Sequence, residues 1–240
     1  MSVTADALTA ALQATWPAAS TRQVGPVTIR EGKGGGARVS AATAPDAMSH
    51  DALVAAEDAM RALGQVPIWQ VTPGPLDDQL AQAGYAIRDR TVFMTAPVDD
   101  VAAMELKLMS AFRTFPPIAV QRDIWAEGGI GPERLAVMDR ACSPKISLLG
   151  RVEDRPMGAA FAAIHDGIAM IHAVEVLDQA RGKGLGRNLM IGAARWAQEQ
   201  GAQTLALLVT EANPARRLYE RMGFETRPGY HYRLRQEETS

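Results

Sequence analysis

The sequence predicts an α/β protein with a mixed sheet, on three observations. Short apolar runs of strand-like composition alternate with segments of helical periodicity along most of the 240 residues. The run Thr204–Val209 is apolar with little alternation, as expected for a strand covered on both faces. A helical segment separates it from the predicted strand Ile168–Val176, so these two strands are expected to pair in parallel.

The first half is expected to begin with an amphipathic helix at Asp6–Thr15, which Trp16-Pro17 ends. Further helices are predicted at Asp46–Leu63, where Leu53, Ala56 and Met60 are spaced for one face, and at Leu76–Ala83; a glycine ends each one. The predicted strands of this half are Val27–Glu31, Arg38–Ala42, Pro67–Val71 and Tyr85–Met94. The glycine-rich run Gly32–Gly36 resembles an anion-binding loop, but it is interpreted as a hairpin turn that precedes no helix.

A long linker helix is predicted within Pro97–Pro117, and a domain boundary at the Pro-Pro that ends it. After it the sequence predicts a strand at Ile118–Ile124 and a helix at Pro132–Cys142. The strands that follow are expected at Ile146–Glu153, Met157–Ile164 and Ile168–Val176. A glycine-rich loop then opens a helix at Arg187–Gln200, and the last elements are the strand Thr204–Val209, a helix from Asn213 to Gly223 and a strand or hairpin at Phe224–Leu234.

Composition narrows the class of protein. The formal net charge is -2, so there is no general electrostatic attraction to nucleic acid or anionic membranes. Cys142 is the only cysteine; it cannot form an internal disulfide, and we interpret it as a structural helix residue. The first residues lack the basic region of a signal peptide, and no run of about 18 apolar residues is present. We therefore expect a cytoplasmic protein without bound metal.

The run from Val174 to Arg187 carries the strongest chemical signal. A strand leads directly into a glycine-rich turn, and the turn opens a helix. Amides in such a loop converge on one point, and the helix N-terminus adds partial positive charge, so together they hold phosphate. The nucleoside-triphosphate P-loop pattern is absent, and the spacing Gly182-x-Gly184-x-Gly186 is not that of a dinucleotide fingerprint.

The stretch 118–235 resembles the GNAT superfamily of N-acetyltransferases. The family's pyrophosphate motif is matched by Arg181-Gly-Lys-Gly-Leu-Gly186 after the strand end Val174-Glu-Val176. Its second signature is matched by Asn213, then Leu218-Tyr219, then Gly223-Phe224. The resemblance implies a splayed, mixed central sheet with flanking helices and direct transfer of acetyl from acetyl-CoA to a primary amine of a small molecule or peptide.

The resemblance also implies roles for individual residues. The pyrophosphate would be held by the loop residues Arg181, Gly182, Lys183, Gly184, Leu185, Gly186 and Arg187. The strand ending at Val174, Glu175 and Val176 would pair with the pantetheine, and the Val176 amide would polarise the thioester carbonyl. Asn213 would bind the pantetheine, cap its helix, or do both. Tyr219 would protonate the departing thiolate, although packing is the alternative for this residue.

The base that deprotonates the amine is left open between three residues. Glu175 and His172 lie on or beside the active strand, and period-two alternation predicts that they face opposite sides of the sheet. His172 matches a histidine of aralkylamine-acetylating relatives, but a strand histidine is often structural. His231 is a third candidate, on the closing hairpin that in this family helps to form the acceptor site.

The first half resembles a degenerate copy of the second. Aligning Gly64 with Gly201 and Gly84 with Gly223 matches strand, helix and Gly-aromatic in order. Carried upstream, this alignment sets Val39 on Val176 and replaces the phosphate loop with Ala-Pro-Asp-Ala-Met-Ser; it also sets Ala81 on Tyr219. We therefore predict a tandem protein: a degenerate domain at 1–97 that binds no CoA, a linker helix at 98–117 and a catalytic domain at 118–240.

Two other functions remain open at this point. A non-catalytic acyl-CoA-binding or sensor protein would use the same fold but has no need of an acid at Tyr219. A scaffold that uses only the fold would bind no CoA. Because two halves in one chain can substitute for a dimer of two chains, a monomer is weakly favoured.

Overall fold

The strands of the second half form a mixed sheet in the computed structural model, which describes residues 3–107 and 110–235. β6 (Lys145–Val152), β7 (Arg155–His165) and β8 (Ile168–Val176) form an antiparallel meander, and β5 (Ala111–Thr114) pairs with β6. β9 (Thr204–Thr210) pairs with β8 in parallel, which confirms the prediction. The crossover between these two strands is α8 (Leu185–Glu199), as a parallel step requires.

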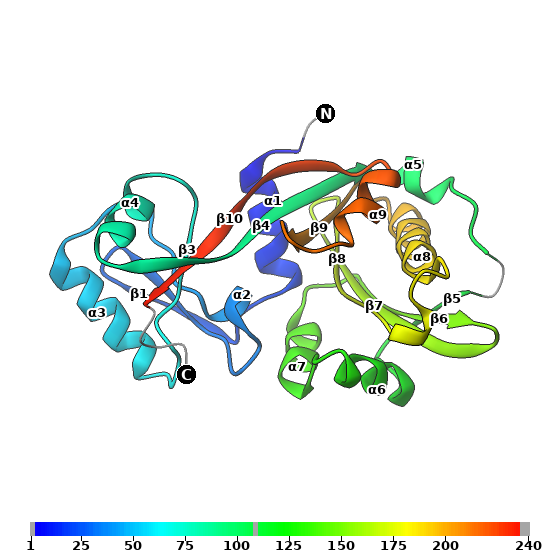
Figure 1. Cartoon of the computed structure of the whole chain (residues 1–240), viewed down its shortest axis with the longest axis horizontal. Coiled ribbons are helices and arrows are strands. Elements are labelled where there is room, and N and C mark those ends of the chain that lie inside the picture. The colour runs from blue at the N-terminus through cyan, green and yellow to red at the C-terminus, as the bar shows by residue number, and fades with distance from the viewer. Residues whose placement is uncertain (1–2, 108–109, 236–240) are drawn as a thin grey trace. The chain divides into compact units, whose positions relative to one another are not determined.

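Contacts divide the chain into two units that are not contiguous in sequence. The major unit contains the residues up to Trp16, Phe93–Val209 and Asn213–Arg227. The minor unit contains Pro17–Val92, Thr210–Ala212 and the residues from Pro228. Two long strands, β4 (Tyr85–Pro97) and β10 (Glu225–Arg235), each carry the chain from one unit into the other (Figure 1).

The N-terminal helix α1 (Ala5–Thr15) belongs to the major unit and packs on β7 and β8. Thr4 begins it, because the Thr4 side chain accepts a hydrogen bond from the Ala7 amide at 3.2 Å. Its C-terminal end is held by the Cys142 amide, which donates to the Ala14 carbonyl at 3.0 Å. The first residues of the chain therefore cover part of the sheet of its second half.

Helices cover both faces of the major sheet. α8 packs on β6, β7 and β8, and a Cβ on Gly158 of β7 would meet the side chains of Leu185 and Leu189. Phe161 lies three residues after Gly158 on the same strand, so its side chain points to the other face of the sheet. There its ring is 6.2 Å from that of Trp16. α6 (Ala119–Glu127) also packs on β7 and β8, and α7 (Pro132–Arg140) follows it.

The remaining elements of the major unit are short. α5 (Val98–Ala102) follows β4, a single 3-10 turn η1 (Asp178–Ala180) follows β8, and α9 (Arg216–Arg221) follows β9. Among the described residues, no helix is long and apolar enough to cross a bilayer.

The minor unit begins with an antiparallel hairpin of β1 (Ser20–Val24) and β2 (Val27–Glu31). Its other elements are α2 (Ala37–Ser40), α3 (His50–Arg61), β3 (Trp69–Val71) and α4 (Pro75–Gln82). An isolated bridge joins Ala42 to Trp69 in parallel, and β3 pairs with β10 in antiparallel fashion. The core of this unit is a cluster of buried apolar side chains: Val27, Ile29, Ala42, Leu53, Ala56, Met60, Trp69, Val71, Leu76, Leu80 and Tyr85.

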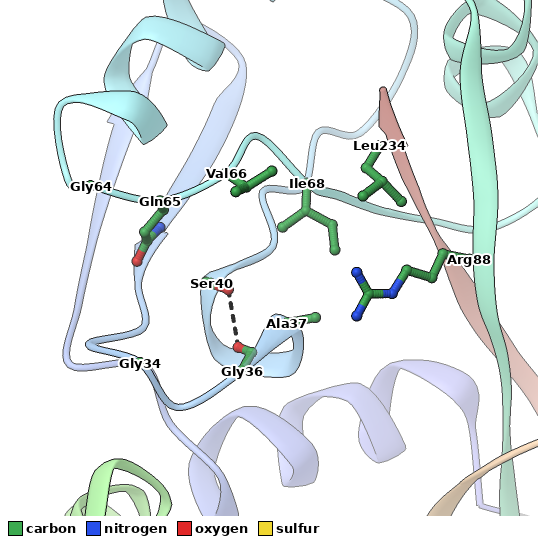
Figure 2. Close-up of a pocket in the computed structure, with 10 residues that line it drawn as sticks. All are labelled: Gly34, Gly36, Ala37, Ser40, Gly64, Gln65, Val66, Ile68, Arg88 and Leu234. Atoms are coloured by element: carbon green, nitrogen blue, oxygen red, sulfur yellow. Dashed lines mark hydrogen bonds between the residues drawn. The ribbon is translucent and has the colours of Figure 1, made fainter. Parts of the chain in front are cut away.

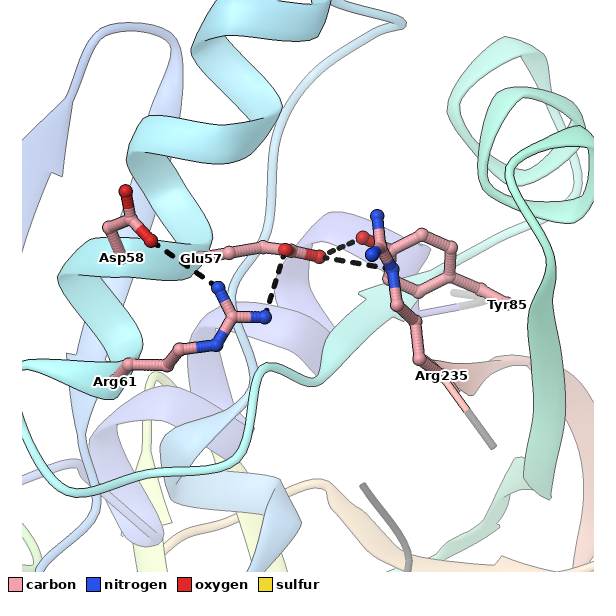
Figure 3. A network of polar contacts seen from close by, with 5 residues as sticks. All are labelled: Glu57, Asp58, Arg61, Tyr85 and Arg235. Atoms are coloured by element: carbon pink, nitrogen blue, oxygen red, sulfur yellow. Dashed lines mark hydrogen bonds and ion pairs between the residues drawn. The ribbon is translucent and has the colours of Figure 1, made fainter. Parts of the chain in front are cut away.

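A buried carboxylate, Glu57, fastens α3 to its neighbours in the minor unit. Its side chain is 4% exposed and accepts a hydrogen bond from the Tyr85 hydroxyl. Arg61 pairs with Glu57 at 3.1 Å, and Arg235 lies 3.9 Å from it with its guanidinium over the Tyr85 ring (Figure 3). A buried charge of this kind needs such partners, so the network favours one arrangement of these elements.

Three predicted elements are wrong in secondary structure. The segment Ile118–Ile124, predicted as a strand, is the N-cap and start of α6. The Gln121 side chain accepts from the Ile118 amide at 3.0 Å and so caps this helix, and burial of Gln121, Ile124 and Trp125 follows helical spacing.

The long helix predicted within Pro97–Pro117 is instead the short α5 and the strand β5, with residues 108–109 outside the described residues. Arg195 of α8 donates to the Ala102 carbonyl at 3.2 Å and to the Met104 carbonyl at 3.1 Å. Carbonyls that a longer helix would use internally are thus satisfied by a distant side chain, which local sequence does not reveal.

The strand predicted at Arg38–Ala42 is mostly the helix α2, so Gly32–Gly36 does precede a helix. Gly36 has φ 92°, and the Ser40 hydroxyl donates back to the Gly36 carbonyl at 3.0 Å. Residues of this run line a cavity of about 510 Å³ together with Gln65, Arg88 and Leu234. Figure 2 shows how these side chains lie around it.

Candidate active site

A bulge in β8 sets the geometry of the candidate site. Phe161 of β7 pairs with His172, and Ala159 pairs with Glu175, so Ala173 and Val174 together stand opposite one β7 residue. Ala173 has φ 50°, in the left-handed region that residues other than glycine seldom adopt. The Trp125 indole nitrogen donates to the Ala173 carbonyl at 2.8 Å and holds it in this orientation.

The bulge overturns the prediction that His172 and Glu175 face opposite sides of the sheet. Phe161 and Ala159 lie two residues apart and so share a face, and residues paired across a ladder point to the same side. His172 and Glu175 therefore lie on one face. The extra residue in β8 means that three steps along β8 correspond to only two steps along β7.

β8 and β9 separate beyond the bulge. Their paired register runs from Ile168 with Thr204 to Ile171 with Leu207, whereas β8 continues to Val176. Over residues 172–176 the β9 side of β8 thus has no strand partner in the part of the chain that the structure describes. Such an edge can accept an extended ligand as an added strand.

The amide of Val176 points towards this open edge. The Leu177 amide donates to Met157 of β7 at 2.9 Å, so it points to the opposite side. Successive amides alternate along a strand, and the Val176 N–H therefore faces away from β7. The Val176 carbonyl accepts from the Arg181 Nε at 3.2 Å.

The glycine-rich loop ends in an open helix N-terminus. Gly184 is the N-cap of α8 with φ 80° and ψ 5°, and a Cβ there would meet nothing within 4 Å. The first backbone hydrogen bond of the helix runs from the Asn188 amide to the Gly184 carbonyl at 3.1 Å. The amides of Leu185, Gly186 and Arg187 come before that bond, so they can bind an anion at the positive end of the helix.

Basic side chains surround the loop, but the structure gives each of them a partner. Arg181 pairs with Asp178 at 2.6 Å and with Glu175 at 3.6 Å, while Lys183 lies 3.7 Å from Glu153. Arg187 donates to the Glu105 carbonyl at 2.7 Å. Backbone amides therefore carry more of the potential for anion binding than the sequence suggested.

α9, which carries Tyr219, packs beside the start of α8. A Cβ on Gly186 would lie 3.3 Å from Leu218 Cδ2, so the residue next to Tyr219 contacts the first turn of α8. Tyr219 is 7% exposed and stacks in a tilted manner on Phe224, with 5.9 Å between ring centroids. Burial raises its pKa to about 12, so its hydroxyl stays protonated and able to donate at neutral pH.

The Asn213 side chain forms a local turn and does not cap the helix as predicted, because α9 begins only at Arg216 and its N-cap is Ala215. Its Oδ1 accepts from the Ala215 amide at 2.9 Å, and the Asn213 carbonyl accepts from Arg216 at 3.1 Å. This is the turn-forming behaviour of asparagine ahead of a helix.

Glu175 and His172 differ in their surroundings. The Glu175 side chain is 18% exposed, and a Cβ on Gly128, just after α6, would overlap its carboxyl group. His172 is 3% exposed, and its ring lies 4.9 Å from that of Trp16. His172 Nε2 is 2.9 Å from the Thr15 hydroxyl, which itself donates to the Ala11 carbonyl at 2.6 Å. The Nε2–H must therefore be the donor to Thr15.

His231 lies in the minor unit, in a different charge network. Its Nε2 is 2.8 Å from Asp77 Oδ1, and Arg233 pairs with the same carboxyl at 2.6 Å. Burial raises the pKa of Asp77, but the hydrogen bonds and charges of Arg233 and His231 outweigh that effect and leave it below its usual value. The acceptor-site role considered for His231 gains no support from these contacts.

Sequence reasoning missed two residues that contact the active strand, Trp125 and Gly128. Both follow directly after Ile118–Ile124, which was predicted as a strand, so no local signal connected these two residues with β8. Among residues 3–107 and 110–235, no group of His, Cys, Asp or Glu is arranged to hold a metal ion.

Comparison with known proteins agrees with this geometry. Residues 112–224 match the sequence model described as the Acetyltransferase (GNAT) family. The Uncharacterized N-acetyltransferase YobR of Bacillus subtilis (strain 168) is 25% identical over 238 residues, which cover 92% of this chain and 95% of that protein.

Two solved structures share the fold. The GCN5-related N-acetyltransferase from Kribbella flavida superposes with a TM-score of 0.71 at 20% identity, covering 94% of this chain and 92% of that one. A tandem GNAT protein from the clavulanic acid biosynthesis pathway gives a TM-score of 0.57 at 14% identity, covering 80% of this chain and 74% of that one. The glycine loop, the separating strands and the helix of Tyr219 all lie within residues 112–224, the stretch that matches the acetyltransferase (GNAT) family, and the chain is an acyltransferase.

Proposed function

We propose that this chain transfers the acetyl group of acetyl-CoA to a primary amine of a small molecule or a peptide. The observation that carries the proposal is the juxtaposition, within one unit, of the open helix N-terminus at Gly184, the open edge of β8 and the phenol of Tyr219. GNAT-family enzymes use acetyl-CoA and act on amines, so the donor and the acceptor class follow from the family.

The residues of the site fit this cosubstrate. The loop from Arg181 to Arg187 offers amides and space for a pyrophosphate, since side chains are missing at the two left-handed glycines Gly182 and Gly184. Val174, Glu175 and Val176 offer main-chain groups to the pantetheine amides along the open edge. Asn213 lies in the turn that leads into α9. Bound acetyl-CoA supplies a thioester whose carbonyl carbon an amine can attack.

The transfer needs one acid and one base. A C–N bond forms between the amine and the acetyl carbon, and the C–S bond breaks. The Val176 amide would stabilise the negative charge that develops on the carbonyl oxygen. Tyr219 would deliver its proton to the departing sulfur, and a base would take the proton that the attacking nitrogen loses.

We assign the base to Glu175 rather than to His172 or His231. Glu175 lies on the open stretch of β8 with part of its side chain in contact with solvent, so a water can relay the proton. His172 donates through Nε2 to Thr15 and is packed between aromatic rings, which favours a structural role. His231 pairs with a buried aspartate in the other unit.

Substituting Glu175 with glutamine is expected to lower kcat about 100-fold and to change the acidic limb of the pH–rate profile, because the amide cannot accept the proton. Gly128→Ala is expected to act in the same direction, since its methyl group would displace the Glu175 carboxyl without backbone strain at φ -82°. Gly131→Ala is the matched control, at φ -85° and with only Glu133 Oε2 nearby. An unchanged pH profile in Glu175→Gln excludes Glu175 as the base.

We further propose that residues 1–97 are a degenerate copy of the catalytic domain. In support, the minor unit has an antiparallel hairpin, a parallel bridge, the helix α3, the strand β3 and the helix α4 in the same order as the corresponding elements of the second half. The solved structure that carries the word tandem in its name shares the fold.

The start of α3 gives a physical reason why this copy would bind no CoA. The Ser49 hydroxyl accepts from the Ala52 amide at 3.3 Å, and the Asp46 carboxylate accepts from the Ala47 amide at 2.7 Å. Gln79 of α4 bonds both the amide and the carbonyl of Met48, at 2.9 and 2.5 Å. Amides that would face a phosphate are thus occupied by the chain's own side chains, one of which is negatively charged.

The test of the proposed function is acetyl-CoA turnover with a panel of small amines and peptides. Turnover is measured by the release of free CoA thiol, and the product is identified by mass spectrometry. We expect an acetylated primary amine with one thiol released per acetyl transferred. Binding of acetyl-CoA without turnover on any amine would favour the sensor alternative. Failure to bind acetyl-CoA would favour a scaffold that uses only the fold.

A further inference from the structure

The C-terminal turn of α6, from Trp125 to Gly128, contacts the active strand at two points. Trp125 is fully buried, and its indole N–H donates to the Ala173 carbonyl at 2.8 Å. Gly128, three residues later, leaves the space that the Glu175 carboxyl group occupies. One helical turn therefore contacts both the bulge and the candidate base.

We propose that Trp125 is a positioning residue for acetyl transfer, because it stabilises the strained bulge that aims the Val176 amide and the Glu175 carboxylate at the open edge of β8. This inference rests on the proposed function, since it assumes that the Val176 amide faces the thioester carbonyl.

The strain at Ala173 is the reason a clamp is needed. A left-handed conformation is disfavoured for a residue with a Cβ, so an isolated strand of this sequence would relax towards regular geometry. Relaxation would remove the extra residue from the bulge. Glu175 would then move to the other face of the sheet, and the Val176 amide would turn towards β7.

The consequence for activity follows from this geometry. Oxyanion donors act through their exact placement, and a shift of a fraction of an ångström is costly. The phosphate loop lies beyond Val176 and starts with its own turn at Asp178–Ala180, so it does not depend on the bulge in the same way. Loss of the Trp125 hydrogen bond should therefore lower kcat more than it weakens acetyl-CoA binding.

The experiment compares the full-length protein with Trp125→Phe, Ala173→Gly and the double variant Trp125→Phe/Ala173→Gly. Phenylalanine keeps an aromatic ring but removes the N–H. We expect Trp125→Phe to lower kcat about five-fold, as for loss of one buried hydrogen bond, with less than about a two-fold change in KM for acetyl-CoA. Glycine adopts positive φ without penalty, so Ala173→Gly should restore most of the lost kcat in the double variant.

A second readout needs no activity: hydrogen–deuterium exchange of the amides of residues 172–177 in the unliganded protein. We expect faster exchange in Trp125→Phe and a return towards the wild-type rate in the double variant. Trp196→Phe, the same change at another buried tryptophan of the major unit, is the control and should leave both readouts unchanged.

The proposal is overturned if Trp125→Phe matches the wild type in kcat and exchange, or if Ala173→Gly rescues neither. If the wild type itself acetylates no amine, the proposed function fails, while the exchange measurements still decide whether Trp125 holds the bulge.

Discussion

Replacing Gly184 with aspartate is expected to weaken acetyl-CoA binding by about 100-fold or more. Gly184 stands at φ 80° as the N-cap of α8, with open space where a side chain would extend. A Cβ at this position adds backbone strain, and a carboxylate adds negative charge where a phosphate would meet the helix amides. Isothermal titration of acetyl-CoA into the purified protein measures the effect.

The matched control for this variant is Gly201→Asp. Gly201 follows the same helix, has φ 77° and is equally open, so the change introduces the same strain and charge at the other end of α8. Gly201→Asp should lose more thermal stability, because its carboxylate lies at the negative end of α8, but only Gly184→Asp should lose acetyl-CoA affinity. The same titration counts sites: the proposal of a degenerate first half requires one site per chain, and two sites would refute it.

Replacing Tyr219 with phenylalanine is expected to lower kcat 100-fold or more while KM for acetyl-CoA changes little. A positioned general acid contributes about 10²–10⁴-fold, and the substitution removes the donor while keeping the ring that packs on Phe224. Steady-state kinetics with a preferred amine would measure it. Tyr230→Phe, which removes a phenol hydroxyl that is also buried but lies in the minor unit, should leave kcat near the wild-type value.

The pH dependence of this acid follows from its pKa. Burial raises the pKa of Tyr219 to about 12, so the protonated form, which is the active one, persists as the pH rises to that value. No loss of rate below about pH 10 should therefore come from Tyr219. A descending limb between pH 7 and 10 that disappears in Tyr219→Phe would contradict the raised pKa of Tyr219.

The backbone geometry of the glycine-rich loop could be predicted from the sequence because it depends on neighbouring residues. Gly182 and Gly184 both adopt positive φ, and the helix that begins after them presents its first amides, as the spacing of glycines indicated. The parallel pairing of β8 with β9 was also predictable, since a helix between two strands of one sheet leaves little other choice.

The arrangement of the candidate bases His172 and Glu175 could not be predicted in the same way. Alternation along Ile168–Val176 predicts opposite faces for His172 and Glu175, whereas the bulge at Ala173 gives them one face. That bulge is held by Trp125, whose hydrogen bond spans 48 positions of sequence. A residue with an unfavourable φ is tolerated only where the surrounding structure compensates for it, so its presence cannot be inferred from the strand alone.

The sequence by itself thus determined the class of fold, most of its elements and the glycine loop before α8, because turns and periodicity are set by neighbouring residues. The tertiary structure alone decided that α1 packs on the sheet of the second half, that Thr15 bonds His172, and that Trp125 and Gly128 contact β8. These contacts join segments far apart in the chain, and their energies depend on burial and close packing that no local pattern encodes.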